Sequence, residues 1–328
     1  MKFLMLKSTD PYYNLAVEEY LFLHSEDDVF MLWQNDRTVV IGKNQNAYAE
    51  LNVDYARENG IKIARRITGG GAVYHDMGNL NYTYISTPKG ENEIDFATFC
   101  QPVIGFLRSV GIEAELSGRN DILVDGKKIS GNAQHSASGR VLHHGTLLYD
   151  SDLSVLSSVL RADPEKLKTK AIRSVSSRVM NLSDILPLEG GALELAEKIM
   201  AELMKKSGGE LISAPESREI DALAERNSSA AWLFPDRAFL SGYTASKKRR
   251  YPFGSVELTL KMSGDVIENA RISGDFFGNK PISELENILC GVKRAEISHR
   301  LENISVDGYI FGMTLKELEI LLTDALED

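Results

Sequence analysis

The sequence has few of the residues that build disulfide frameworks or thiolate metal sites. Only two of its 328 residues are cysteine, Cys100 and Cys290, and they are too far apart in sequence to form a metal-spaced pair. A disulfide framework is therefore not expected, which fits a reducing compartment. No apolar run approaches the roughly 18 residues of a membrane span, and the stretch between Lys2 and Lys7 is too short for a signal-peptide core. These absences predict a cytoplasmic protein with no membrane partner.

The sequence also lacks an excess of positive charge. Its 37 lysines and arginines are outnumbered by 47 aspartates and glutamates, which gives a formal net charge of −10. General nucleic-acid binding needs a basic surface and is not expected here, although a local basic patch can exist on an acidic body. The 43% of hydrophobic residues is ordinary for a globular protein, and the chain length suggests two domains.

The most unusual stretch that is present covers residues 65–76 and reads RRITGGGAVYHD. Three consecutive glycines are uncommon inside a helix or strand, because each costs roughly 1 kcal/mol there. They suit a place where the backbone passes tightly around another group and turns its N–H groups toward it. Arg65, Arg66 and Thr68 add donors, so the stretch suits a phosphate or carboxylate. A tight hairpin that needs glycine only for its turn explains the same glycines, and the stretch alone does not separate the two interpretations.

A second informative stretch covers residues 118–131. Asp125 and Gly126 lie between two strand-like runs, which is a strong signal for a two-residue hairpin. Lys128 then lies on the returning strand, on the face opposite Ile129, and Gly131 allows another group to come close. Most strand lysines are simply solvated, and that interpretation stays open here, although the place of Lys128 between the turn and Gly131 adds weight to a functional role.

Two adjacent histidines, His143 and His144, lie in a strand-like run over residues 141–149. Neighbouring side chains point to opposite faces of a strand, so these two are poorly placed to share a metal ion. No cysteine, aspartate or glutamate stands at ligand spacing beside them. We expect one of them to be a hydrogen-bonded histidine of the core.

The rest of the pattern mixes helices and strands. Hydrophobic periodicity predicts a helix capped by Asn14 over residues 15–22, and further elements follow. Helices are expected over 54–58, 96–110, 152–160, 164–167, 192–206, 221–226, 283–289 and 314–326, and strands over 29–33, 38–41, 61–64, 80–85, 256–260 and 266–272. Residues 170–179 are basic and rich in hydroxyls, which suits a phosphate-contacting loop or an ordinary surface connector.

The best domain boundary lies in residues 245–252, which are polar, strongly basic and end in Pro252. We therefore expect a larger domain over residues 1–246, a linker over about 247–252 and a small α/β domain over residues 253–328. The smaller domain is near the lower size limit for independent folding.

Together these stretches resemble the lipoate–protein ligase A family. The family's arginine–glycine loop matches residues 65–76, and its later blocks match residues 118–121, 128–131, 144–148 and 174–179. The Gly-Asp-Phe-Phe-Gly turn of the family's accessory domain matches residues 274–278. The resemblance spans nearly the whole chain, with the blocks in the family's order.

This resemblance implies an α/β catalytic domain of the biotin/lipoate ligase fold, related to class II tRNA synthetase cores, followed by a small C-terminal α/β accessory domain. It also implies an ATP-dependent, adenylate-forming enzyme. Lipoate and MgATP would give lipoyl-AMP and pyrophosphate, and the lipoyl group would then pass to a lysine of a lipoyl domain. The implied acceptors are E2 subunits of 2-oxoacid dehydrogenases and the glycine-cleavage H protein, and a monomer is favoured.

The matched motifs also imply roles for single residues. Lys128 would be the catalytic residue that bridges the α-phosphate and the acyl oxygen, and Asp121 would contact Mg²⁺, which prefers oxygen ligands. Asn79 would lie near the adenine, and Arg173 and Arg178 on a loop that closes over the adenylate. The expected substrate- and ATP-binding residues are Arg65, Arg66, Thr68, Gly69, Gly70, Gly71, Ala72, Val73, Tyr74, Asn79, Asn120, Asp121, Lys128, His144, Gly145, Arg173 and Arg178, with Trp33, Val73 and Tyr74 beside the apolar lipoyl chain.

Three other functions are alternatives for this sequence. An octanoyl transferase of the same fold needs a cysteine nucleophile after the Lys-x-Ser-Gly block, but residues 132–142 contain none, and Cys100 is expected to be packing. A biotin ligase is disfavoured by the accessory domain. A non-catalytic protein that binds lipoyl carriers is disfavoured by the presence of Arg65, Lys128 and Asp121 together.

Overall fold

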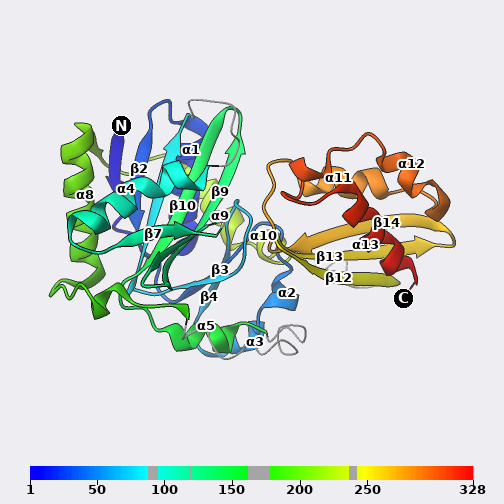
Figure 1. Cartoon of the computed structure of the whole chain (residues 1–328), viewed down its shortest axis with the longest axis horizontal. Coiled ribbons are helices and arrows are strands. Elements are labelled where there is room, and N and C mark those ends of the chain that lie inside the picture. The colour runs from blue at the N-terminus through cyan, green and yellow to red at the C-terminus, as the bar shows by residue number, and fades with distance from the viewer. Residues whose placement is uncertain (88–94, 119, 162–177, 236–241, 328) are drawn as a thin grey trace. The chain divides into compact units, whose positions relative to one another are not determined.

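The computed structural model describes residues 1–87, 95–118, 120–161, 178–235 and 242–327. The chain forms two compact units (Figure 1). The larger comprises Met1–Val40, Tyr48–Arg65 and Val73–Leu233, and the smaller comprises Ile41–Ala47, Arg66–Ala72 and Phe234–Asp328. Within the described residues, no helix is long and apolar enough to cross a membrane.

The larger unit is built on an eight-stranded sheet in the order β11-β1-β2-β6-β10-β9-β8-β7. Strand β1 pairs in parallel with β11 and β2, and the remaining pairs are antiparallel. The strands are β1 (Lys2–Met5), β2 (Val29–Trp33), β6 (Asn79–Ser86), β7 (Ala114–Ser117), β8 (Asp121–Val124), β9 (Lys127–Ala137), β10 (Arg140–Leu148) and β11 (Glu210–Ile212). A second sheet has the order β4-β3-β5, made of β3 (Thr38–Ile41), β4 (Lys62–Arg65) and β5 (Val73–His75).

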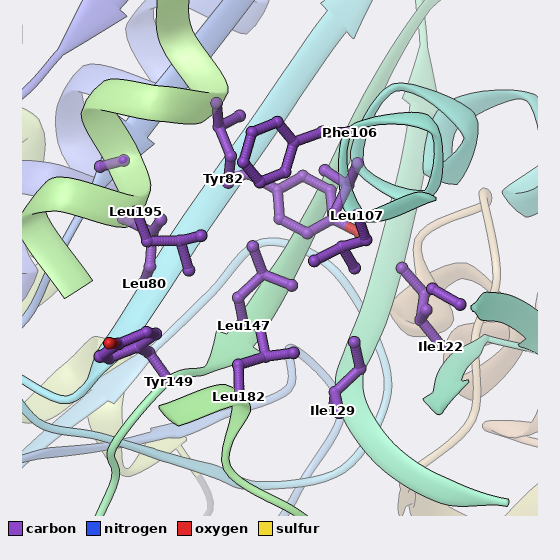
Figure 2. Close-up of a cluster of buried hydrophobic side chains, with 14 of the residues drawn as sticks. Leu80, Tyr82, Phe106, Leu107, Ile122, Ile129, Leu147, Tyr149, Leu182 and Leu195 are labelled. Carbon is purple, nitrogen blue, oxygen red and sulfur yellow. The ribbon is translucent and has the colours of Figure 1, made fainter. Parts of the chain in front are cut away.

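One face of the large sheet forms the main apolar core. Helices α4 (Phe96–Ser109) and α8 (Gly191–Ser207) contribute side chains to it, and β6 and β10 contribute theirs from the sheet. Figure 2 shows Leu80, Tyr82, Leu147 and Leu195 gathered in this cluster. Burying such side chains contributes roughly 1.5–3 kcal/mol each, so this face holds the strands in register.

The opposite face of β6 and β10 is polar and is contacted by α1 (Pro11–His24). Glu18 of α1 accepts hydrogen bonds there from side chains of both strands. The other helices of the larger unit or its borders are α2 (Ala47–Glu50), α3 (Val53–Glu58), α5 (Leu153–Val159), α9 (Arg218–Ser228) and α10 (Ala230–Leu233). The large sheet therefore has one apolar face, which packs the core, and one polar face, which is able to hold polar ligands.

The smaller unit contains a three-stranded antiparallel sheet in the order β12-β13-β14. Its elements are β12 (Ala245–Tyr251), β13 (Gly254–Ser263), β14 (Val266–Gly274), α11 (Ile282–Leu289), α12 (Ile297–Leu301) and α13 (Leu315–Glu327). Val256, Leu258 and Leu260 are buried in its core, as their alternation predicts. Residues 247–251, expected in the linker over 247–252, form most of edge strand β12, and Pro252 follows it in a turn.

Several expected elements are confirmed and one cap is wrong. Strands over 29–33 and 38–41 are present, and Asp125 and Gly126 have φ values of 50° and 73°, as a two-residue hairpin turn requires. The first helix begins at Pro11, not after Asn14, because Asp10 accepts bonds from the Tyr12 and Tyr13 N–H groups. The helix expected over residues 164–167 lies outside the described residues.

The core face also contains His143, as expected for one of the two histidines. Its ring stacks on Phe99 at 5.5 Å, and its Nε2 lies 3.8 Å from the Cys100 Sγ. Burial lowers the pKa of His143 from 6.5 to about 3, because the charged ring would lose its hydration. This histidine is therefore neutral in the folded protein at neutral pH.

We predict that His143 makes the larger unit acid-sensitive. Below pH 6.5 the unfolded chain gains a proton here that the folded chain does not take up until about pH 3. Stability should therefore fall by about 1.4 kcal/mol per pH unit through this window from this group. His143→Phe keeps the stacking and removes the titration, so denaturant unfolding at pH 7 and pH 4.5 should show a loss about 2–3 kcal/mol smaller than in the wild type. Equal losses in the two proteins would contradict the assignment.

Candidate functional site

The triple-glycine segment belongs to the smaller unit and packs on the turn over residues 274–278. The Gly70 N–H donates to the Phe276 carbonyl at 3.2 Å. A Cβ on Gly69 would lie only 2.3 Å from that same carbonyl oxygen, and one on Gly42 would lie 2.1 Å from the Gly70 carbonyl. The glycines are thus needed for close backbone packing, and in this structure the Gly70 amide already has an acceptor.

Arg66 braces this segment from inside. Its Nη2 donates to the carbonyls of Gly69 at 2.7 Å and Gly71 at 2.8 Å, and its Nε donates to Thr68 Oγ1 at 2.9 Å. The guanidinium is buried and fixes the backbone of the loop that carries the expected ligand-binding amides. Ala72 ends this part of the smaller unit.

Arg65 has a different surrounding, in the larger unit. Its Nε donates to the Trp232 carbonyl at 2.9 Å and its Nη2 to the Leu233 carbonyl at 2.7 Å. The Trp232 Nε1 donates back to the Arg65 carbonyl at 3.0 Å, and the ring also lies under the Arg226 guanidinium, 4.3 Å away. The structure therefore places Arg65 in a clamp between β4 and the end of α10, which two neighbouring arginines in a sequence do not reveal.

Lys128 lies where the hairpin predicts, on β9 just after the turn. Its Nζ forms an ion pair with Asp121 Oδ1 at 2.7 Å, and both side chains are about a third exposed. A Cβ on Gly131 would lie 2.8 Å from Nζ, so the group that Gly131 admits is the Lys128 side chain. The pairing of β8 with β9 shifts by one residue between Ile122 and Leu123, a bulge that leaves Ile129 in the core.

A row of paired residues crosses the sheet at this level. Asp121 pairs with Gly131, whose N–H donates to Thr146 Oγ1 at 3.2 Å. Thr146 pairs with Asn81, and Asn81 pairs with Trp33. Directly paired residues place their side chains on the same face. The row therefore carries a cation and polar groups across the polar face of β9, β10 and β6.

The next pair along β6 and β10, Thr83 and His144, contacts the buried carboxylate of Glu18 from α1. Glu18 Oε1 accepts from Thr83 Oγ1 at 2.6 Å and lies 2.9 Å from His144 Nδ1. The Trp33 Nε1 donates to Thr83 Oγ1 at 2.9 Å. His144 is thus part of a polar network on the face opposite His143. Glu18 was missed in the sequence because helix α1 brings it to the strands from far along the chain.

The asparagines of β6 lie on this polar face. Asn79 and Asn81 alternate with the core residues Leu80 and Tyr82, and both are buried. The Asn79 Nδ2 donates to Asn81 Oδ1 at 3.0 Å. Asn79 was expected in the site and Asn81 was not, although the alternation of Asn79, Asn81 and Thr83 was visible in the sequence.

Other expected site residues have structural roles that the structure makes clear. The Asn120 Nδ2 donates to the Asn132 carbonyl at 2.6 Å, which ties the start of β8 to β9. A Cβ on Gly145 would lie 2.1 Å from Asn132 Oδ1 and 2.6 Å from the Tyr82 hydroxyl, so Gly145 is required on the core side. The Met180 N–H donates to the Lys128 carbonyl at 3.0 Å, two residues after the exposed Arg178.

Of the other expected residues, Val73 and Tyr74 make no hydrogen bond or ion pair with Lys128 or Asp121 in the part of the chain that the structure describes. Val73 and Tyr74 are in β5, where burial raises the pKa of the Tyr74 hydroxyl. Arg173 lies outside the described residues. Across the parts of the chain that the structure describes, no cluster of three or more histidine, cysteine, aspartate or glutamate side chains could hold a metal ion.

Cys100 is unsuited to be an acyl-accepting nucleophile. It lies in the core on α4, and burial raises the pKa of its thiol to about 12. A thiolate is the reactive form of cysteine, so this thiol stays protonated at neutral pH. The expectation that Cys100 is a packing residue is confirmed.

Comparison with known proteins identifies the family. The lipoyl protein ligase A/B catalytic domain model matches residues 10–204, and the bacterial lipoate protein ligase C-terminus model matches residues 241–322. Lipoate-protein ligase LplJ of Bacillus subtilis is 38% identical over 320 residues, which cover 94% of this chain and 95% of that protein. The chain belongs to the lipoate–protein ligase family, as its motifs predict.

Solved structures agree with this assignment. The P. falciparum protein LipL1, solved in complex with lipoate, matches with a TM-score of 0.81 and 24% identity, over 98% of this chain and 99% of that one. A lipoate-protein ligase A bound with ATP matches with a TM-score of 0.59 and 27% identity, over 71% of this chain and 98% of that one. The expected α/β ligase fold and the ligase class of enzyme are confirmed, and the expected substrates lipoate and ATP are the molecules bound in these two solved structures.

We predict that Gly131→Ala displaces the Lys128 ammonium without unfolding the protein. The new methyl would meet only the flexible end of the lysine, at 2.8 and 3.0 Å, so the free energy of unfolding should change by less than about 1 kcal/mol. Lipoate-dependent release of pyrophosphate from ATP should fall by about tenfold or more, because small displacements of a reacting group are costly. Gly105→Ala, whose Cβ would meet nothing within 4 Å, is the matched control. Activity of Gly131→Ala within about twofold of the control would contradict the role expected for the Lys128 ammonium.

Proposed function

We propose that this chain joins lipoate to ATP on the polar face of the large sheet, beside Lys128, and then transfers the lipoyl group to a protein lysine. The observation that carries this proposal is the Lys128 ammonium, fixed over Gly131 by the Asp121 carboxylate 2.7 Å away. A fixed cation in a partly buried setting suits a reaction that gathers negative charge at one place.

The first step needs such a charge centre. A lipoate carboxylate oxygen attacks the α-phosphorus of ATP, and the bond from that phosphorus to the departing pyrophosphate oxygen breaks. Negative charge then accumulates between two anions, and Lys128 neutralises it at the new acyl–phosphate link. Asp121 keeps the ammonium in place, so little reorganisation is needed when the charge develops.

The second step uses the same centre. The acceptor lysine's neutral amine attacks the acyl carbon and gives up one proton to solvent, and the bond from that carbon to the AMP oxygen breaks, giving an amide and AMP. Lys128 again lies beside the oxygen that gains charge. A bipartite lipoate protein ligase from Thermoplasma acidophilum, similar in structure to this chain, is described together with its E2 lipoyl domain. We propose E2 subunits of 2-oxoacid dehydrogenases and the glycine-cleavage H protein as the acceptors of a monomeric enzyme.

We propose binding residues for each part of these substrates. Each buried methylene of the lipoyl chain would contribute about 0.8 kcal/mol, and the buried Trp33 offers apolar surface beside Thr83. The expected ligands of the phosphates and the acyl end are Arg65, Arg66, Thr68, Gly69, Gly70, Gly71, Ala72, Val73, Tyr74, Asn120, His144, Gly145, Arg173 and Arg178, and Asn79 is the expected neighbour of the adenine.

Magnesium would arrive with the nucleotide. Mg²⁺ usually keeps several waters and is held by one or two carboxylates together with substrate phosphates. Asp121 is the carboxylate that fits this pattern, and its exposure of about a third leaves it accessible beside Lys128. When bound, the ion would draw charge from the phosphates and lower the barrier to displacement of pyrophosphate.

We predict that Lys128→Ala abolishes adenylate formation and leaves the fold intact. Loss of a charge-stabilising donor should lower lipoate-dependent pyrophosphate release by about 10²–10³-fold. Lys127→Ala is the matched control, because Lys127 is exposed on the neighbouring position of the same strand, and its rate should stay within about twofold. Incubation with lipoate, ATP, Mg²⁺ and apo lipoyl domains, measured by intact mass, would show the same difference. Unchanged pyrophosphate release in Lys128→Ala would refute the role.

A further inference from the structure

Two buried amide atoms on the polar face stand out. A hydrogen bond joins Asn79 Nδ2 to Asn81 Oδ1. The other two side-chain atoms of this pair, Asn79 Oδ1 and Asn81 Nδ2, have no hydrogen-bond partner among the described residues. The two residues are 0% and 2% exposed. An unsatisfied buried polar atom costs about 1–3 kcal/mol of folding free energy. Two such atoms side by side are explained if a bound ligand supplies the missing hydrogen bonds, so the state to consider is the ligand-bound one.

The place of Asn81 in the row suggests what that state is. Asn81 pairs with Thr146, and Thr146 accepts from the N–H of Gly131, over which the Lys128 ammonium lies. Neighbouring strands are about 4.8 Å apart. The Asn81 amide and the Lys128 ammonium therefore flank the same stretch of the polar face, about two strand spacings apart, and a molecule lying across β10 would reach both.

We propose that the Asn81 Nδ2 is a second donor to the acyl–phosphate centre, acting together with Lys128. This inference rests on the proposed function. The oxygens of an acyl–phosphate link accept hydrogen bonds, and a neutral donor already removed from water strengthens such a bond without adding charge. The Asn81 Nδ2 donor, which has no partner among the described residues, would thus donate a hydrogen bond to an oxygen of the reacting link.

Asn79 fixes the direction of that donor. Its Nδ2 holds the Asn81 Oδ1, so the other end of the Asn81 amide projects the N–H₂ group away from Asn79. Along β6, Thr83 lies on one side of Asn81 and Asn79 on the other. The acyl chain, the reacting link and the nucleoside would follow the order Thr83, Asn81, Asn79, which is consistent with the expected place of Asn79 beside the adenine.

The experiment compares Asn81→Asp and Asn81→Ala with the control Gln134→Glu. Gln134 is also a buried amide in this sheet, with an Nε2 that has no partner among the described residues. It pairs with His143, however, and so lies on the other face of the sheet. Lipoate-dependent pyrophosphate release and transfer from preformed lipoyl-AMP are measured separately, each as kcat and KM.

We expect both Asn81 variants to lose about 10²-fold in kcat in both half-reactions, because a donor to the reacting centre acts in each. KM for ATP and lipoate should change less than about threefold, and Gln134→Glu should stay near wild type. A kcat within about threefold of wild type in a folded Asn81 variant would overturn the proposal, as would a loss confined to KM.

Two further measurements keep the outcomes distinct. If the Asn81 variants do not fold, a crystal structure of the wild type with a non-hydrolysable sulfamoyl analogue of lipoyl-AMP decides instead. Asn81 Nδ2 within hydrogen-bonding distance of the acyl–sulfamoyl group supports the proposal, and a distance beyond about 4 Å rejects it. If wild-type protein releases no pyrophosphate with lipoate, the proposed function itself is wrong. If the wild type is active and the Asn81 variants are equally active, only this inference is wrong.

Discussion

The ion pair between Lys128 and Asp121 is the interaction on which the proposed chemistry of this protein depends. It exists because a two-residue turn at Asp125 and Gly126 folds β9 back on β8, and because Gly131 leaves room for the lysine to lie along the strand. The carboxylate holds the ammonium at one position while leaving it partly exposed. A lysine free in solvent would lose side-chain entropy each time it met a substrate, and this one has already been ordered by folding.

One face of the large sheet packs the core, and the other carries the proposed binding site. On one face the core closes around Leu80, Tyr82 and Leu147, and even a histidine there is kept neutral. On the other face the same strands carry Asn81, Thr83 and Thr146. Because strand side chains alternate with period two, each step along β6 serves both purposes in turn, and a slip by one residue would exchange the faces.

Local signals predicted much of this structure. The hairpin, the close approach at Gly131 and the core role of one histidine all follow from turn chemistry and strand alternation, which need only neighbouring residues. Asn14 was misassigned as a cap because its side chain suits that role, whereas Asp10 followed by Pro11 forms the actual start. Strand β12 was missed because its basic residues look like a linker, although charged residues are common on an edge strand.

Long-range arrangements could not be predicted in the same way. Arg65 and Arg66 are adjacent, yet one clamps Trp232 and the other supports the glycines, and this choice depends on chain segments far away in the sequence. Glu18 and Thr146 belong to the candidate site only through the packing of α1 and the pairing of β10 with β6. Such residues carry no motif of their own, because their roles come from register and packing.

The contact between Gly70 and Phe276 has a consequence for biosynthesis. Both residues belong to the smaller unit, but the ribosome makes the second about two hundred residues after the first. At roughly 5–20 residues per second, the glycine segment waits tens of seconds for the carbonyl that completes it. A nascent chain can therefore build the large sheet early, while its triple-glycine segment acquires its final support only as translation nears its end.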